Sequence, residues 1–436
     1  MEQINNISKK DWLFWSFFLF IFIYAPPLLP YTHLILGSII FIIILLHYNR
    51  SYGETFKKSD INTWMKTMIA VFVYAILIPF PLSIFYNDVV DLPHYYHLFN
   101  RFAILIFMEG VCTTFLLTKF NKKNYNLFTL LRLLIGIAII QSFLGCLAFM
   151  VPGIKQIFLK FMINMGGLST ENEGVILYRT FGFAGSMLDQ FGYGTGLLAG
   201  ISFFLGVYYK SRYILYSVIV ILASLLNARS GIVIYIIAIF ITLFFALCID
   251  RKIKMVLKSI AFFILIPTVF VTVLQVVSLY NENTGTWINK GVESVAEFVT
   301  TGSSDQDNMN VITSDQFWQL PDGANVILGT GHSRYEAEGY LHTDNGLVND
   351  IWFVGIAGLV LLYGVVILLC YRIFRKSQTY IERFISIFFI CSFFVFDIKA
   401  ASIGYNMGGA VFFLIVFATR YFQNKRYDSC KEVKEG

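Results

Sequence analysis

Long apolar runs follow one another along the chain from residue 12 to residue 420, and short polar segments separate most of them. A helix needs about 20 mostly apolar residues to cross roughly 30 Å of hydrocarbon. Because such runs recur from end to end, the pattern predicts an all-α polytopic membrane protein, with about twelve transmembrane helices in a single domain over 1–436. The predicted spans are 12–29, 31–47, 66–85, 101–118, 127–150, 190–208, 213–227, 230–249, 259–279, 346–371, 384–396 and 403–420.

Two features of the pattern set the number of spans. The seventh and eighth runs would merge, except that the polar segment 227–231 interrupts them and predicts a turn. The first run follows Lys9 and Lys10, but Pro26 and Pro27 lie near its end, and there is no small-x-small cleavage site. We therefore expect the first run to remain as a transmembrane helix rather than to be removed as a signal peptide.

The composition agrees with a membrane protein, and the basic residues give its orientation. The chain is 57% hydrophobic and only 14% charged, well below the charge content of soluble domains. Positively charged loops stay in the cytoplasm, so a cytoplasmic N-terminus places most of the 33 Lys and Arg residues inside. The inner clusters are Lys57/Lys58, Lys122/Lys123, Lys210/Arg212, Arg251/Lys252/Lys254, Arg372/Arg375/Lys376 and Lys425/Arg426. Both termini are predicted to be cytoplasmic, and the net charge of +6 reflects this orientation rather than nucleic-acid binding.

The same topology places two long loops outside, at about 151–189 and, between helices 9 and 10, at 280–345. Loops longer than about 15 residues without regular structure are usually functional. We expect these two loops to form a cap over the outer face of the membrane domain. The six cysteines fall in predicted spans or in the inner tail, so no disulfide framework is expected.

Acidic residues and histidines in the outer loop do not have the spacing of a metal site. Asp305 and Asp307 form the DxD pattern that binds metal in glycosyltransferases using nucleotide sugars, but such sugars are absent outside the membrane. His332 and His342 match no standard set of metal ligands. We therefore predict neither a metal nor another cofactor.

Glu109 lies near the middle of the fourth predicted span. A carboxylate in hydrocarbon is costly and is usually functional or paired. Two interpretations stay open for it: a functional group, or a protonated or hydrogen-bonded packing residue.

Arg179 and Arg229 lie on the outer side, against the bias that removes basic residues from that face. Arg179 precedes the sixth span and Arg229 lies in the turn 227–231, so both are expected at the level of the outer headgroups. A guanidinium suits phosphate there, because its planar fork gives charge-assisted bidentate bonds. Phosphate binding and plain headgroup anchoring both fit, and the tight turn favours phosphate binding for Arg229.

Several short motifs occur in one order on the predicted outer side. Arg-x-x-Gly (179–182) precedes an outer-to-inner span, and the Asn-Ala-Arg-Ser-Gly turn (227–231) comes next. The long loop ends in Gly-Thr-Gly (329–331) and His-Thr-Asp-Asn-Gly (342–346), and Gly-Ile-Ala-Gly (355–358) lies in the following helix. This combination, over more than half of the chain, resembles the O-antigen polymerase and O-antigen ligase superfamily of bacterial membrane glycosyltransferases.

The resemblance implies a glycosyltransferase of the GT-C type in the bacterial inner membrane. Its donor would be an undecaprenyl-pyrophosphate-linked oligosaccharide on the outer side, transferred to the acceptor sugar of another lipid-linked repeat unit. Repeated transfer would lengthen a polysaccharide such as an O antigen or a capsule. A lipid-linked donor brings its own leaving group, so neither nucleotide nor metal is needed, and a flippase and a chain-length regulator are expected partners.

The resemblance also suggests roles for individual residues. His342, where the long loop re-enters the membrane, is the candidate general base, and Arg229 is expected to stabilise the pyrophosphate as the glycosidic bond breaks. The expected substrate-binding residues are Arg179, Arg334, His332 and Asp344. Asp344 could orient His342 or cap the tenth helix, and we prefer the cap.

Two other functions compete with a repeat-unit polymerase. An O-antigen ligase uses the same chemistry, although the residue after the histidine, Thr343, departs from the ligase pattern. A lipid-linked oligosaccharide flippase or other transporter would be expected to have related halves and charged residues along a central pathway. The sequence contains no internal repeat, which favours the polymerase.

Overall fold

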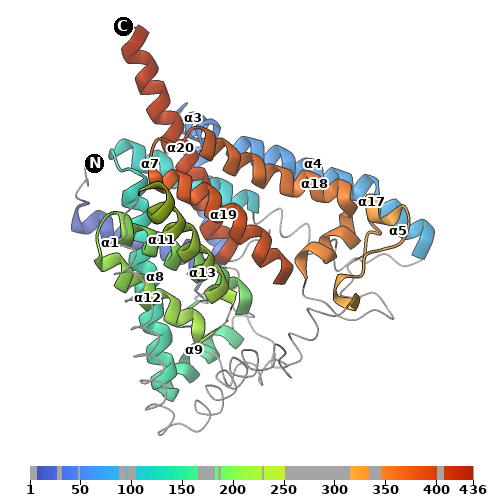
Figure 1. The fold of residues 1–436 in the computed structure, drawn as a ribbon, viewed down its shortest axis with the longest axis horizontal. Coiled ribbons are helices and arrows are strands. Elements are labelled where there is room, and N and C mark those ends of the chain that lie inside the picture. The colour runs from blue at the N-terminus through green and yellow to red at the C-terminus, as the bar shows by residue number, and fades with distance from the viewer. Residues whose placement is uncertain are drawn as a thin grey trace.

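In the part of the chain that the structure describes, every regular element is a helix (Figure 1). The computed structural model describes residues 7–26, 32–47, 50–87, 95, 105–164, 182–184, 188–227, 230–250, 315–332, 345–399 and 407–435. The first helices are α1 (Lys9–Tyr24), α2 (Thr32–Leu46), α3 (Arg50–Lys58), α4 (Ile61–Leu77), α5 (Pro79–Asn87), the π-helix η1 (Leu105–Cys112), α7 (Thr113–Lys122), α8 (Leu127–Met150) and α9 (Pro152–Asn164). They are followed by α11 (Leu188–Tyr208), α12 (Arg212–Leu225), α13 (Ser230–Phe244), the π-helix η3 (Phe245–Ile249), the 3-10 turn η4 (Asp315–Trp318), α17 (Asn325–Leu328), α18 (Gly346–Arg375), α19 (Tyr380–Lys399) and α20 (Met407–Glu435).

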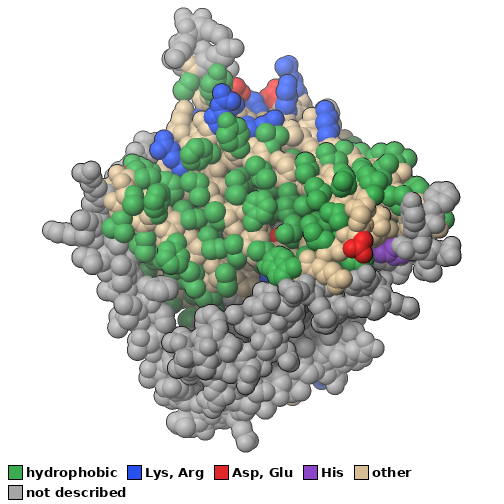
Figure 2. All heavy atoms as spheres, turned by 45° about the vertical axis from the view of Figure 1, so that its right-hand side comes forward, with side chains coloured by type: hydrophobic (Ala, Val, Ile, Leu, Met, Phe, Trp, Pro, Cys, Tyr) green, Lys and Arg blue, Asp and Glu red, His purple; other side chains and the backbone are tan. Residues whose placement is uncertain are grey.

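Several helices have the length and composition of membrane spans. Five candidates lie within the described ranges: Ile61–Ile84, Leu127–Met150, Gln190–Tyr208, Ser230–Ile249 and Gly346–Arg375. Large apolar side chains are exposed on them, such as Phe143 (65% exposed) and Phe240 (70%), and Figure 2 shows a broad hydrophobic face with Lys and Arg gathered along its upper edge. Such a surface favours aggregation in water, whereas hydrocarbon accommodates it. These apolar helices fit a multi-pass membrane protein, as the sequence predicts.

Helix α11 forms the centre of the bundle, with α12, α13, α19 and α20 packed around it. Gly192, Gly196 and Gly200 of this helix form a double GxxxG, a sequence pattern that predicts close approach of helix backbones, and the structure confirms it. A Cβ atom on Gly196 would lie 2.6 Å from the carbonyl oxygen of Gly231 on α13, and one on Gly200 would lie 2.5 Å from Cβ of Ala238. Small residues therefore set the distance between α11 and α13.

Ion pairs join the helix ends that carry the basic clusters. Asp60, which precedes α4, accepts hydrogen bonds from Arg420 Nε on α20 (2.6 Å) and from an Arg372 guanidinium nitrogen at the end of α18 (3.3 Å). Arg420 is only 3% exposed, so this contact is a buried ion pair rather than a surface one. Arg426 pairs with Glu382 at the start of α19. The start of α4 is thus fixed to α18 and α20, which lie far from it in sequence, and α20 is fixed to α19 at the same end.

The helices differ from the predicted spans at several places, and α20 continues the predicted span 403–420 to Glu435. The predicted span 66–85 is broken at Ile78, because Pro79 supplies no N–H and disfavours helical geometry in the residue before it. Within the predicted span 101–118, residues 105–112 form the π-helix η1. Helix α19 is longer at both ends than the predicted span 384–396. The predicted ninth span, 259–279, lies outside the described residues, as do large parts of the two long loops.

Candidate functional site

The structure describes one of the six residues to which the sequence analysis gave a role in the site. His332 lies at the end of a described segment that begins at 315. The other five lie outside the described ranges: Arg179, Arg229, Arg334, His342 and Asp344. The described part of the candidate site consists of His332, the residues flanking Arg229, and the helices that support them.

The segment that leads to His332 docks onto the first half of α18. The backbone N–H and the hydroxyl of Thr330 both donate to the carbonyl oxygen of Trp352, at 2.7 and 2.8 Å. The N–H of Gly331 donates to the carbonyl oxygen of Phe353 at 3.2 Å. In the sequence the Gly-Thr-Gly motif simply precedes this helix. In the structure, backbone hydrogen bonds join the two.

These bonds are possible because α18 breaks at Gly355. That residue has φ +67° and ψ 179°, so the helix stops there and resumes, and the carbonyl groups before the break can accept hydrogen bonds from another segment. Gly329 has a similar conformation, with φ +86° and ψ 160°, in a region that essentially only glycine occupies. The two chain segments cross at these glycines and touch there, since a Cβ on Gly329 would lie 2.7 Å from the backbone nitrogen of Gly355. The sequence predicts the motif 355–358 within a helix. In the structure, the first residue of the motif is the point at which that helix breaks.

Helices α4 and α5 support this crossing from the other side. The Tyr74 hydroxyl on α4 donates to the carbonyl oxygen of Leu328 at 3.0 Å. Gly331 fits closely against the chain near α5, because a Cβ there would lie 2.6 Å from the carbonyl oxygen of Pro79 and 2.8 Å from the Tyr95 hydroxyl oxygen. A broken helix and its partner loop at membrane depth are tolerated where protein surrounds them, and discontinuous helices of this kind form binding sites in many membrane proteins.

His332 emerges from this crossing with its backbone fixed. Its N–H donates to the Thr330 hydroxyl oxygen at 3.1 Å. Its Nε2 atom is buried and has no hydrogen-bond partner among the described residues. A buried imidazole nitrogen without a partner is costly, so it is available to a polar group of a ligand. Across the described ranges, no group of three His, Cys, Asp or Glu side chains is placed to hold a metal ion.

The start of α18 corrects one sequence-based prediction. We expected Asp344 to cap this helix, but the N-cap is Asn345, whose side-chain oxygen accepts from the N–H of Val348 at 3.2 Å. A helix needs only one residue at this position, so the capping role of Asp344 is wrong. Its other suggested role, orienting His342, stays a prediction.

The turn that carries Arg229 is held by residues on both of its sides. Helices α12 and α13 are separate, as the polar interruption predicts. Asn227 is buried, and its N–H donates to the carbonyl oxygen of Ser224 at 3.0 Å. Gly231 lies against α11, where a Cβ would be 2.5 Å from the carbonyl oxygen of Gly192. Gly231 therefore packs one flank of Arg229 against the first turns of the central helix, while Asn227 ties the other flank to the end of α12.

Sequence reasoning missed a buried carboxylate at the same end of α11. Asp397 of α19 is 1% exposed, and the predicted eleventh span stopped one residue before it. Its neighbour Phe396 stacks on Tyr193 of α11 with ring centroids 4.2 Å apart. On α20, a Cβ at Gly408 would lie 3.0 Å from Cγ of Tyr193. The start of α11, the end of α19 and the start of α20 thus meet around Tyr193, close in sequence to the anchors of the Arg229 turn.

Glu109 is fully buried in the π-helix η1, which packs against α2. Neither carboxyl oxygen has a hydrogen-bond partner among the residues that the structure places, so the hydrogen-bonded packing interpretation finds no support there. Single turns of π-helix often occur at functional sites. Glu109 is therefore either a protonated packing residue or a group that acts on a ligand or a proton.

We expect Glu109→Gln to have the thermal unfolding midpoint of the wild type and an activity within about twofold of it. The reason is that an amide of the same shape meets the same apolar surroundings. Glu109→Ala should lower the thermal unfolding midpoint, because it leaves a cavity. Both midpoints can be measured on the purified protein in detergent, together with glycan length in cells, which reads the activity expected from the family resemblance. A folded Glu109→Gln protein without activity would contradict the packing role and give Glu109 a proton-handling one.

Comparisons with protein-family models, with curated proteins and with solved structures gave no match for this chain. The class that the fold supports is a helical protein with several apolar helices of membrane-spanning length.

Proposed function

We propose that the protein is a polysaccharide repeat-unit polymerase of the inner membrane. It would transfer an undecaprenyl-pyrophosphate-linked glycan to the acceptor sugar of a second lipid-linked repeat unit, on the outer side. The observation that carries the proposal is the crossing of Gly329 and Gly355. It joins two motifs of the family that the sequence resembles, and next to the broken helix it leaves His332 with a buried ring nitrogen that has no hydrogen-bond partner among the described residues.

The proposed chemistry needs a positive site at the membrane surface and a base. In the transfer, the bond between the donor sugar and its pyrophosphate breaks, and the acceptor hydroxyl forms the new glycosidic bond. Arg229, assisted by Arg179 and Arg334, would stabilise the charge that develops on the leaving pyrophosphate. His342 would take the proton of the acceptor hydroxyl. His332 would donate to or accept from a sugar hydroxyl through its free nitrogen.

The proposed orientation has both termini in the cytoplasm. The gathering of Lys and Arg along one edge of the hydrophobic face supports it, because basic segments stay on the cytoplasmic side (Figure 2). The starts of α18 and α13 would then face outward, with His332 and the Arg229 turn on the same side as the lipid-linked donor.

A flippase or another transporter of lipid-linked oligosaccharide is the second candidate. The buried carboxyl of Glu109 and the break in α18 favour it, since transporters combine intramembrane ionisable groups with discontinuous helices. An O-antigen ligase remains the alternative within the same chemistry.

Deletion of the gene in its own host separates these candidates. We expect surface glycan to shift from long chains to a single repeat unit on the final acceptor, because units are still exported and attached but not joined. Glycan length is read on a gel, and a plasmid copy of the gene should restore it. Loss of all surface glycan, with lipid-linked units trapped inside the cell, would indicate a flippase. Long chains that accumulate on the lipid carrier would indicate a ligase.

A further inference from the structure

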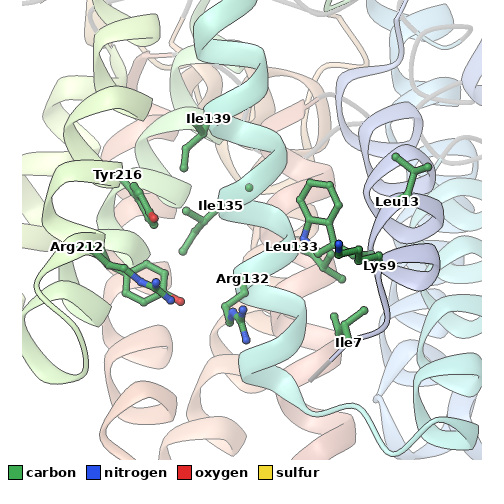
Figure 3. A pocket seen from close by; sticks show the side chains of 12 residues that line it. Ile7, Lys9, Leu13, Arg132, Leu133, Ile135, Ile139, Arg212 and Tyr216 are labelled. Carbon is green, nitrogen blue, oxygen red and sulfur yellow. The ribbon is translucent and has the colours of Figure 1, made fainter. Parts of the chain in front are cut away.

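A groove of about 690 Å³ lies between α1, α8 and α12, away from the candidate site (Figure 3). Lys9 from α1, Arg132 from α8 and Arg212 from α12 line it at the ends where α1 and α12 begin. Figure 3 shows the three cations on neighbouring helices, with Ile139 and Tyr216 further along the same groove. One end of the groove is therefore basic, and the other is largely apolar.

The three cations have no acidic partner in the groove. No Asp or Glu is among the residues that line it, and none of the ion pairs between described residues involves these three cations. Asp11, on the first turn of α1, is occupied elsewhere, since it binds Lys123 and accepts from the Tyr125 hydroxyl at 2.9 Å. These two hydrogen bonds hold the pKa of Asp11 below its ordinary value. The groove thus concentrates positive charge that no acidic side chain among the described residues neutralises.

Helix geometry adds to this charge. Helices α1, α8 and α12 all begin near the basic end, at Lys9, Leu127 and Arg212. The first N–H groups of a helix and its dipole give this end a partial positive charge that attracts anions. The surface beside the groove is apolar, with Trp12 40% and Leu13 67% exposed, so a bound anion there would lie next to hydrocarbon rather than open water.

We propose that this groove binds the phosphate headgroup of an anionic phospholipid of the cytoplasmic leaflet. The phosphate lies among Lys9, Arg132 and Arg212, and an acyl chain follows the apolar wall past Ile135 and Ile139. Charge complementarity selects an anion, and the joined apolar wall selects a lipid over a free phosphate ion. The site is independent of the proposed polymerase activity, because it lies at the opposite end of the membrane domain in the proposed orientation.

The test uses the purified full-length protein, reconstituted in vesicles of phosphatidylglycerol and phosphatidylcholine in equal parts, and then extracted for native mass spectrometry. We expect the wild type to retain phosphatidylglycerol in preference to phosphatidylcholine. The variant with Lys9→Gln, Arg132→Gln and Arg212→Gln should retain about 10- to 100-fold less, because each basic residue near a lipid surface contributes several-fold to binding. The matched control changes Lys10, Lys122 and Arg375 to Gln, which removes the same charge from residues that do not line the groove.

Two further variants keep the test decisive if the triple variant does not fold. Arg132→Lys with Arg212→Lys keeps the charge and should keep the lipid. Gly136→Leu keeps all three cations but fills the groove beside Trp12, where even a Cβ would lie 3.7 Å from the indole ring, and should lose the lipid. Equal retention by the wild type and Gly136→Leu, or equal loss in the control and the triple variant, would overturn the proposal. Displacement of the lipid by millimolar inorganic phosphate would assign the site to a free anion instead.

Discussion

Gly355→Ala is expected to destabilise the protein by about 2 to 6 kcal/mol and to abolish activity, because two costs add at this position. The backbone conformation of Gly355 is one that essentially only glycine adopts, which costs about 1 to 3 kcal/mol for any other residue. A Cβ would also collide with the carbonyl oxygen of Ile327 and the backbone nitrogen of Gly329, and overpacking of this kind costs about 1 to 3 kcal/mol. Both contacts are with backbone atoms, which cannot rotate away.

The matched control is Gly364→Ala on the same helix, where a Cβ would meet no atom within 4 Å. Its unfolding midpoint in detergent should equal or slightly exceed that of the wild type, since alanine favours a helix over glycine. The measurement is the midpoint for both variants, together with the protease sensitivity of the segment 315–332. Equal midpoints for Gly355→Ala and Gly364→Ala would show that the crossing of Gly329 and Gly355 does not stabilise the fold.

Arg229→Lys is expected to lose most polymerising activity even though it keeps the charge. An ammonium group cannot reproduce the planar fork that holds a pyrophosphate through two bonds. Loss of one such charge-assisted contact costs about 2 to 4 kcal/mol in the transition state, or roughly 30- to 1,000-fold in rate. Membrane insertion should be normal, because contacts of Asn227 and Gly231 hold the chain on both sides of the substituted residue. Full activity would reduce Arg229 to a headgroup anchor.

His342→Ala tests the second half of the same mechanism. We expect the rate to fall about 100-fold or more, while binding of the lipid-linked donor stays largely unchanged, because a general base acts on the acceptor. His332→Ala is the matched comparison, and it should weaken substrate binding more than it lowers the rate at saturation. Chain lengths and donor binding are measured for both. Wild-type chain lengths from His342→Ala would remove it from the catalytic role.

The apolar runs predicted several of the described helices. The predicted span 127–150 has the same bounds as α8. The polar interruption at 227–231 correctly separated α12 from α13. Long apolar runs with polar ends carry their own information, because each helix satisfies its backbone within itself. The double GxxxG of α11 likewise predicted a close contact, although not that α13 would make it.

The features that sequence reasoning missed depend on contacts between distant segments. The break at Gly355 is invisible in hydropathy, because the segment that packs against it, at Gly329, comes from another part of the chain. Arg420 is the last residue of the predicted span 403–420, and its position in the sequence gives no sign of burial. In the structure it is buried and forms an ion pair with Asp60, which is 360 residues earlier in the chain. The order of the motifs indicated that 329–331 and 355–358 belong together, but only the fold places one on the other.

The central claim is that the protein joins lipid-linked repeat units without a nucleotide or a metal. The most direct measurement reconstitutes the purified protein in vesicles with lipid-linked repeat units, in the presence of a metal chelator, and follows product length over time. The proposed function predicts a ladder of products longer than one repeat unit, which Arg229→Lys and His342→Ala form slowly. Repeat units that stay unjoined with the folded wild-type protein, but move across the vesicle membrane, would contradict the polymerase and favour the transporter.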